Sequence, residues 1–417
     1  MTIMTKMMTE KNENKIAIAL IETSEYDIDV NELTELAKTA GLEVSMIYTQ
    51  KRSSPDNSTY FGSGKVAEIK ESLNANNIKT IIFNDELSSI QHANLTDELD
   101  AEVMDRTNLI LQIFSLHAKT AEGKIQVELA RLKYLLPRLR MTPGELSRQG
   151  AGVLARGPGE TKLEMNKRYI KERIHKLKED LAEIEKQRGI TRENREKSRL
   201  PLIALVGYTN AGKSTLFNKL TESNVLVENK LFATLDTTVR RTELAPNLFA
   251  LFSDTVGFIK NLPHHLVESF KSTLEEITYA DIILNVCDAS DPQVDEHIKV
   301  TRAQLDSLKI TAKIFDIYNK CDLLSDGNTI PKSATSIGIS ALTGFGMDAL
   351  KKTLINEIQS KYTYVKLFLP YSKMKELADL QAISYDTMLE YVENGLDISG
   401  YFLTAYYGKF GKLIKND

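Results

Sequence analysis

The chain contains 417 residues, which exceeds what a single hydrophobic core organises, so about two to four domains are expected. Its net charge of −4 excludes a uniformly basic nucleic-acid-binding protein, and its two cysteines exclude a disulfide framework and a cysteine-rich zinc site. The sequence has no run of about 18 apolar residues and no apolar segment near its start, so we expect a cytoplasmic protein, with peripheral membrane association as the alternative.

The first part of the chain alternates between strand and helix patterns. Residues 1–14 are polar and expected to be disordered, and within 15–120 the apolar runs at 15–21, 43–49 and 79–84 predict strands. Helical periodicity at 30–40, 64–76 and 88–99 completes a small parallel α/β domain. The run FGSGKV at 61–66 is similar to a phosphate loop. Because it lacks the full spacing and a hydroxyl after the lysine, nucleotide binding is not expected there.

Residues 121–199 contain two long stretches with apolar side chains every three or four positions, which predict an antiparallel helical hairpin. A basic segment, residues 131–173, carries eleven Lys or Arg against four Glu and includes a glycine-rich connection at 137–160. Glycine lets the backbone approach phosphates and arginine pairs with them, so RNA contact is one interpretation. A solvated helix face is the other. The candidate RNA contacts are Arg138, Arg140, Arg148 and Arg156.

A second α/β pattern occupies residues 200–360, and its first strand leads into a complete phosphate loop before a helix that begins with Lys213. Glycines let backbone N–H groups surround phosphates, Lys213 reaches the β- and γ-phosphates, and the Ser214 hydroxyl ligates Mg²⁺. This loop alone would serve an ATPase equally well. Its residues and the first helical residues are Gly207, Tyr208, Thr209, Asn210, Ala211, Gly212, Lys213, Ser214 and Thr215.

A later strand ends in the motif Asp254-Thr255-Val256-Gly257. The motif places a carboxylate beside the metal and a glycine N–H where a γ-phosphate would lie, which favours a hydrolase or switch. The predicted catalytic residues are therefore Lys213, Asp254 and Gly257. Phe258 follows, where many GTPases carry a glutamine that orients the attacking water, so slow intrinsic hydrolysis is expected unless a partner or ion completes the site.

The nucleobase is indicated by Asn319-Lys320-Cys321-Asp322, which follows a strand. A fixed carboxylate accepts hydrogen bonds from both N1–H and the 2-amino group of guanine, and adenine lacks that pair, so Asp322 predicts guanine specificity. Another strand ends in Ser340-Ala341-Leu342, whose backbone can meet guanine O6. Because these motifs stand at the carboxyl ends of strands, where open α/β sheets bind ligands, the sequence predicts a Ras-like P-loop GTPase domain.

Between the phosphate loop and the next strand, a mobile loop carrying a Mg²⁺-binding threonine is expected. Thr234, Thr237 and Thr238 all qualify by their chemistry. The predicted nucleotide contacts in this loop are Phe232, Ala233, Thr234, Leu235 and Asp236.

The last part, residues 361–417, predicts a small α+β domain. VKLFLPY and YFLTAYYG have strand patterns, and SKMKELADL has a helical pattern. Its aromatic residues are expected to belong more to a core than to an interface.

Across nearly its whole length the chain resembles the HflX family of translational GTPases. The resemblance rests on YFGSGK, GPGETKLE, GYTNAGKSTLFN, LFATLD, DTVGFIKNLP and NKCD, which occur in the family's order. It implies an N-terminal α/β domain with a helical hairpin, a GTPase domain, and binding to the large ribosomal subunit with the hairpin loop near the peptidyl-transferase centre. Members of the family split stalled or stress-inactivated ribosomes.

The resemblance also implies roles for particular residues. Thr234 matches the switch threonine, which adds it to Ser214 as a Mg²⁺ ligand. Asn210 matches an asparagine that helps to hold a monovalent cation in related potassium-dependent GTPases, so K⁺ joins GTP, GDP and Mg²⁺ as an expected ligand. Thr237 departs from the proline of many relatives, which bears on the stiffness of the switch loop.

The favoured interpretation is a monomeric GTPase that binds the large ribosomal subunit and its RNA and rescues or splits stalled ribosomes. The alternative is a nucleotide-gated adaptor for a non-ribosomal protein or for RNA alone, with incidental hydrolysis. A metabolic ATPase is the weakest rival.

Overall fold

The computed structural model describes residues 14–22, 30–139, 162–198, 200–222, 231–232, 238–255, 257–259, 266, 276–308, 310–324, 330–331 and 333–414. The chain forms two compact units. Unit 1 spans Met1–Ile184 with Asn229–Leu235 and Asn261–Lys271, and unit 2 spans Glu185–Glu228, Asp236–Lys260 and Ser272–Asp417. None of the helices in the described ranges combines the length and apolar character that crossing a membrane requires.

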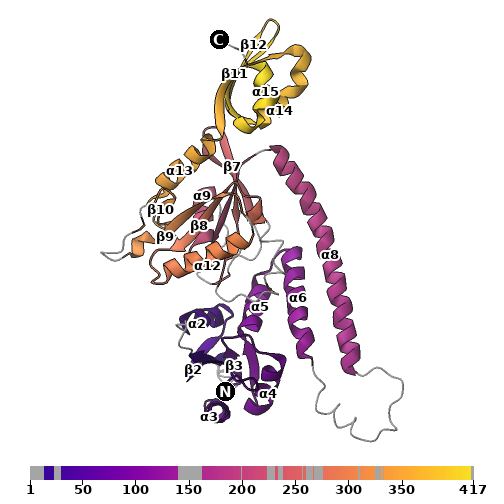
Figure 1. Ribbon diagram of the computed structural model, residues 1–417, viewed down its shortest axis with the longest axis vertical. Helices are drawn as coiled ribbons and strands as arrows, with labels where there is room; N and C mark the ends of the chain where they lie inside the picture. The colour runs from indigo at the N-terminus through magenta and orange to yellow at the C-terminus, as the bar shows by residue number, and fades with distance from the viewer. Residues whose placement is uncertain are drawn as a thin grey trace, which may run out of the picture. The chain divides into compact units, whose positions relative to one another are not determined.

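Unit 1 contains a parallel four-stranded sheet in the order β2-β1-β3-β4. The three predicted strands and three predicted helices are confirmed to within two residues, and Figure 1 shows them in indigo. The strand β4 and the helix α5 were not predicted, since β4 has only four residues and leads directly into α5. The bounds are β1 (Lys15–Glu22), α2 (Val30–Thr39), β2 (Glu43–Lys51), α3 (Ser63–Ala75), β3 (Thr80–Phe83), α4 (Ser89–Leu99), β4 (Glu102–Asp105) and α5 (Arg106–His117).

The FGSGKV run forms the start of α3, with Gly62 at the N-cap. The Lys65 ammonium lies 2.7 Å from the Glu68 carboxylate. The run therefore begins an ordinary surface helix of the α/β domain.

The predicted helical hairpin consists of α6 (Ala121–Leu135), the 3-10 turn η1 (Leu136–Arg138) and the long helix α8 (Lys162–Ser198). Within unit 1, α6 and the first part of α8 lie side by side in Figure 1. The Arg173 guanidinium donates two hydrogen bonds, of 2.7 and 2.8 Å, to the Glu128 carboxylate on α6. Ile170 and Leu177, two residues of the predicted apolar seam, are buried. The glycine-rich connection from Arg140 onward lies outside the described residues.

Unit 2 contains a six-stranded sheet in the order β10-β9-β8-β5-β7-β6. All neighbouring strands are parallel except the edge strand β6, which pairs antiparallel with β7. The elements are β5 (Leu202–Gly207), α9 (Lys213–Thr221), β6 (Thr238–Ala245), β7 (Leu248–Asp254), β8 (Ile282–Asp288), α12 (Val294–Ser307), β9 (Lys313–Asn319), η2 (Cys321–Leu323), β10 (Ser336–Gly338) and α13 (Met347–Gln359).

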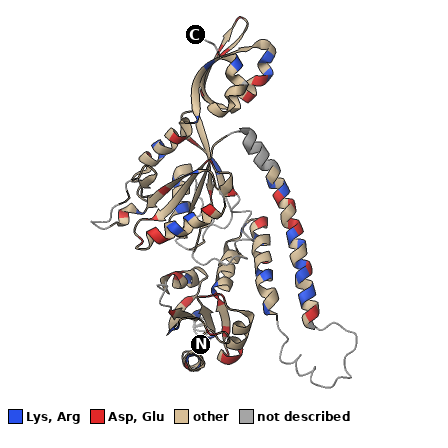
Figure 2. Cartoon of the chain, viewed as in Figure 1, with Lys and Arg blue, Asp and Glu red and all other residues tan. Residues whose placement is uncertain are grey.

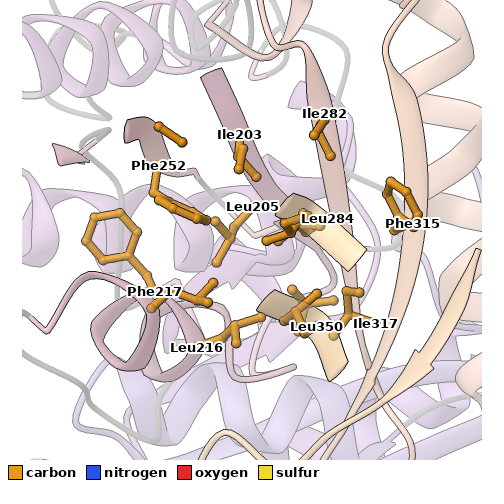
Figure 3. Close-up of a cluster of buried hydrophobic side chains, with 14 of the residues drawn as sticks. Ile203, Leu205, Leu216, Phe217, Phe252, Ile282, Leu284, Phe315, Ile317 and Leu350 are labelled. Carbon is orange, nitrogen blue, oxygen red and sulfur yellow. The ribbon is translucent and has the colours of Figure 1, made fainter. Parts of the chain in front are cut away.

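One face of this sheet carries a large apolar cluster, shown in Figure 3. Alternate residues of four strands point toward α9 and α13, as the period of two in a strand requires. The cluster fixes the phosphate-loop helix against the sheet. Its members include Ile203, Leu205, Leu216, Phe217, Phe252, Ile282, Leu284, Phe315, Ile317 and Leu350.

The end of the chain forms an antiparallel three-stranded sheet in the order β11-β13-β12, with β11 (Tyr362–Pro370), β12 (Ser384–Val392) and β13 (Gly395–Leu403). The strand predicted at YFLTAYYG is wrong beyond Leu403, because residues 404–406 form the 3-10 turn η4 (Thr404–Tyr406) and α15 (Tyr407–Phe410) follows. The helix predicted at SKMKELADL is divided between the 3-10 turn η3 (Tyr371–Glu376) and α14 (Leu377–Ala382).

Candidate nucleotide-binding site

The phosphate loop connects β5 to α9 with the backbone that its motif requires. Gly207 and Gly212 have φ values of 141° and 90°, in the left-handed region that favours glycine. A Cβ atom on Gly207 would collide with the Val286 carbonyl oxygen of β8. The loop is therefore packed too closely on the sheet for a side chain at that position.

Lys213, the first residue of α9, directs its ammonium into the loop. Its Nζ donates hydrogen bonds to the carbonyl oxygens of Gly207 (3.1 Å) and Tyr208 (2.7 Å). Burial lowers the pKa of this ammonium to about 8, while the nearby Asp254 carboxylate raises it. The lysine thus lies where it can meet phosphate oxygens, and its charge titrates near physiological pH.

Nucleotide binding is expected to depend on the protonation of Lys213. Phosphates favour the charged ammonium of Lys213. At pH values at which the free protein has lost this proton, GDP binding therefore takes up a proton. Affinity for GDP is consequently highest below pH 8 and falls as pH rises above it. Calorimetric titration near pH 8 in two buffers of different ionisation enthalpy measures this uptake. A Lys213→Arg variant is the control, because its guanidinium stays charged. Equal pH dependence in both proteins would contradict the assignment.

Ser214, a predicted metal ligand, and Asp254, predicted to lie beside the metal, meet where α9 begins and β7 ends. The Ser214 hydroxyl donates a 2.9 Å hydrogen bond to Asp254 Oδ2, and Asp254 is fully buried. No cluster of three or more His, Cys, Asp or Glu side chains suited to a metal occurs in the described part of the chain. Mg²⁺ that is bound with nucleotides takes one or two protein oxygens together with phosphate oxygens and waters, and the Ser214 hydroxyl is placed to supply one such oxygen.

Asn319 ties the base-reading motif to two other parts of the site. Its Nδ2 donates to the Ala211 carbonyl oxygen in the phosphate loop, and its Oδ1 accepts from the Ala341 N–H, both at 2.9 Å. Asp322 is exposed in η2, and Leu342 is exposed beyond Ala341. Ser340 is buried, and its hydroxyl accepts a hydrogen bond from Thr343 N–H. The phosphate loop, the Asn319 motif and the Ser340 motif are thus connected through the side chain of Asn319.

Asp288 is a member of the site that sequence analysis missed. Its Oδ2 lies 2.6 Å from the Lys320 ammonium, and its Oδ1 accepts hydrogen bonds from the Ser290 N–H and hydroxyl. Lys320 itself has a left-handed backbone, with φ of 64°. Asp288 therefore orients the lysine of the base-reading motif. The available signal was a carboxylate at the carboxyl end of a buried strand next to the phosphate loop.

The Tyr208 side chain anchors the phosphate loop to α12. Its ring stacks on the His297 ring with centroids 3.8 Å apart and planes 9° from parallel. The His297 imidazole lies 3.4 Å from Asp291 Oδ2. This stack was not predicted, because Tyr208 and His297 lie far apart in sequence.

After β7 ends at Asp254, the chain passes beside the phosphate loop. The Thr255 hydroxyl donates to the Leu205 carbonyl oxygen at 2.6 Å. Phe258 N–H donates to Gly207 O at 3.0 Å, and Thr209 N–H donates to Phe258 O at 2.8 Å. The Phe258 side chain is buried. Phe258, which stands where many GTPases carry a glutamine, is thus held in place by its backbone hydrogen bonds to Gly207 and Thr209.

Of the predicted switch loop, Leu231, Phe232 and Thr238 are described. Leu231 and Phe232 belong to unit 1, whereas Thr238 is the first residue of β6 and pairs with Asp254 of β7. The Phe232 ring packs edge-on against Phe114, with centroids 4.8 Å apart. The other predicted contacts of this loop lie outside the described residues, namely Ala233, Thr234, Leu235 and Asp236. Val256 of the β7 motif also lies outside them.

Arg138, one of the four arginines expected to contact RNA, is held inside unit 1. Its guanidinium donates to the Leu87 carbonyl oxygen at 2.6 Å and to Asp105 Oδ2 at 3.3 Å, and it stacks over the Tyr134 ring. Only 9% of the side chain is exposed. This placement is a correction, because a guanidinium that is paired with Leu87 and Asp105 inside unit 1 is not presented for contact with RNA. Arg140, Arg148 and Arg156 lie outside the described residues.

The fold and the site together define a P-loop GTPase. Residues 202–320 match a family described as 50S ribosome-binding GTPase, while 27–115 and 117–195 match the N-terminal and middle regions of a GTP-binding GTPase. Relatives named GTPase HflX from Caldanaerobacter subterraneus subsp. tengcongensis and from Escherichia coli are 44% and 37% identical. The alignments cover 94% and 91% of this chain and 91% and 92% of those relatives. The chain belongs to the HflX family of GTPases.

Solved structures with similar chains include a GTP-binding protein from Sulfolobus solfataricus in complex with GDP, at 27% identity and a TM-score of 0.44, covering 82% of this chain and 99% of that one. A complex of SsGBP with GDP is 28% identical, with a TM-score of 0.49, and covers 82% of this chain and 98% of that one.

Proposed function

We propose that this GTPase acts on the large ribosomal subunit, where it splits or rescues stalled ribosomes as a monomeric cytoplasmic factor. The observation that carries the proposal is the match of residues 202–320 to a family described as a 50S ribosome-binding GTPase. That segment holds the phosphate loop and the first two residues of the base-reading motif, Asn319 and Lys320. The part of the chain that holds the phosphate loop is therefore also the part whose family match indicates a ribosomal partner.

The basic segment supports a contact with ribosomal RNA. Figure 2 shows Lys and Arg repeatedly along the first part of α8. Exposed cations along one helix can neutralise successive phosphates, and the release of counterions then favours binding. The exposed basic residues described there are Arg168, Lys171, Lys176 and Lys178. With Arg138 assigned to the interior of unit 1, the proposed RNA contacts of the connection are Arg140, Arg148 and Arg156.

We include two cations in the proposal. Mg²⁺ would be held by the Ser214 hydroxyl and by Thr234, and it would neutralise charge on the β- and γ-phosphates. The hydrogen bond between Ser214 and Asp254 supports this choice, because it holds the hydroxyl beside a carboxylate at the end of the phosphate loop. K⁺ would lie at Asn210, whose φ of 61° is compatible with a tight loop around an ion.

GTP turnover measured with and without isolated large ribosomal subunits, at physiological potassium and magnesium, tests the proposal. We expect stimulation of at least about tenfold, since partners that complete a GTPase site raise turnover by roughly 10³–10⁵. The buried Phe258 has no polar group to offer the attacking water, so a partner or an ion that completes the site can raise turnover. Absence of both stimulation and binding would favour a nucleotide-gated adaptor for another protein.

The RNA contact has its own test. Replacing Arg140, Arg148 and Arg156 with Ala is expected to weaken binding to the large subunit and to reduce its salt dependence by about 0.7–0.9 in the logarithmic slope for each lost phosphate contact. The matched control replaces Lys352, Lys373 and Lys375, three exposed lysines of unit 2, with Ala. Equal cosedimentation and equal salt slopes for the two triple variants would refute the arginine contacts.

A further inference from the structure

The residue after Gly257 cannot orient the attacking water in this protein. Phe258 has no hydrogen-bonding group in its side chain, and its backbone is paired with Gly207 and Thr209 by hydrogen bonds of 3.0 and 2.8 Å. Its side chain is only 4% exposed. The hydrolysis of GTP therefore needs another polar group near the γ-phosphate.

Three residues converge beside the expected γ-phosphate position. An ideal Cβ atom built on Gly257 would lie 2.8 Å from Thr209 Cγ2 and 3.0 Å from Lys213 Nζ. Lysine at this position of a phosphate loop reaches the β- and γ-phosphates, and the glycine of the β7 motif offers its N–H to the γ-phosphate. The Thr209 side chain consequently borders the same point.

The hydroxyl of Thr209 is buried and has no hydrogen-bond partner among the residues that the structure describes. Leaving a buried hydroxyl in that condition destabilises the fold, and such groups are uncommon in native proteins. The methyl group Cγ2 is the branch that faces Gly257 in the structure. Rotation of about 120° between staggered χ1 rotamers brings the hydroxyl to the methyl position.

We propose that Thr209 is a catalytic residue whose hydroxyl contacts the γ-phosphate and the attacking water. A hydroxyl has one donor and two acceptor sites, so it can donate to a γ-phosphate oxygen while it accepts a hydrogen bond from the water. The water oxygen forms a bond to the γ-phosphorus, the bond from that phosphorus to the bridging oxygen of GDP breaks, and the water proton passes to the released phosphate. Thr209 keeps its own proton and forms no covalent bond.

Two substitutions separate the hydroxyl from the shape of the residue. Thr209→Val retains the β-branched shape and removes the hydroxyl, whereas Thr209→Ser retains the hydroxyl and removes the methyl group. We expect Thr209→Val to lower the single-turnover rate of GTP hydrolysis by roughly 10- to 100-fold, with GDP affinity unchanged, because the γ-phosphate is absent from GDP. Thr209→Ser is expected to keep most of the activity.

The melting temperature Tm distinguishes a catalytic role of the Thr209 hydroxyl from a purely structural one. Removing an unpaired buried hydroxyl is expected to leave Tm unchanged or to raise it, so a slower Thr209→Val variant cannot be explained by lost stability. An unchanged hydrolysis rate in Thr209→Val would overturn the proposal. So would equal losses in both variants accompanied by weaker GDP binding, since that result would assign the effect to loop shape. The test uses hydrolysis by the full chain alone and is independent of the ribosomal partner.

Discussion

Replacing Asp322 with Asn is expected to lower the affinity for GDP by roughly 10²–10³-fold. The carboxylate accepts two hydrogen bonds from guanine, whereas an amide presents a donor to one of guanine's donors. Asp322 is exposed in η2, between the anchored Asn319 and the strand β10, so the change alters the ligand contact without opening the core.

The same substitution is expected to improve binding of xanthosine diphosphate. Xanthine carries a carbonyl oxygen where guanine carries its 2-amino group, so the new amide donor has an acceptor to meet. A gain for one nucleotide beside a loss for another cannot arise from misfolding. Competition titration with GDP and xanthosine diphosphate measures both changes.

Asp379→Asn provides a matched control, because it makes the same chemical change at an exposed aspartate of α14. It should leave both affinities as they are in the unmodified chain. If the Asp322→Asn protein bound GDP as tightly as the unmodified chain does, Asp322 would not be the residue that reads the base.

The parts of the site that were predictable from sequence are those in which the backbone itself carries the chemistry. Gly207 and Gly212 are required because the loop needs left-handed φ values and a close approach to β8, and a motif with fixed spacing reports both. Asn319 was predictable for a similar reason, since a motif of fixed spacing places it at the carboxyl end of a strand, and it is the last residue of β9. Its hydrogen bonds to Ala211 and Ala341 then follow from the parallel sheet.

Asp288 shows what the sequence could not supply. Its contact with Lys320 depends on the register of β8 and β9, in which Asp288 lies opposite Asn319. Register is determined by the packing of whole strands and has no short motif. The stacking of Tyr208 on His297 has the same origin, because it depends on how α12 packs against β5 and β8.

Arg138 illustrates the limit of reading local composition. A run of arginines and glycines is typical of RNA contacts, but two of the partners of this guanidinium, Leu87 and Asp105, lie more than 30 residues earlier. The end of β13 is a similar case. Aromatic residues continue the strand pattern past Leu403, whereas the Thr404 N–H donates to Lys361 O and the chain turns there.

Gly212→Ala is expected to lower guanine-nucleotide affinity by at least about 10²-fold. Gly212 has φ of 90°, which costs an L-residue about 1–2 kcal/mol, and a Cβ atom there would collide with Asn319 Nδ2. Moving Asn319 breaks its hydrogen bonds to Ala211 and Ala341, so the phosphate loop and the base-reading loops lose their common anchor. Fluorescent GDP titration measures the loss.

Gly41→Ala separates backbone strain from the collision. Gly41 has φ of 81°, and a Cβ atom there would find nothing within 4 Å, so this substitution adds strain alone. It is expected to lower Tm with no change in GDP affinity. Adding Asn319→Ser to Gly212→Ala shortens the side chain that the new methyl group meets. If collision is the cause, the double variant should bind GDP about as well as Asn319→Ser alone, whereas two additive losses would show that Gly212 acts through its backbone only.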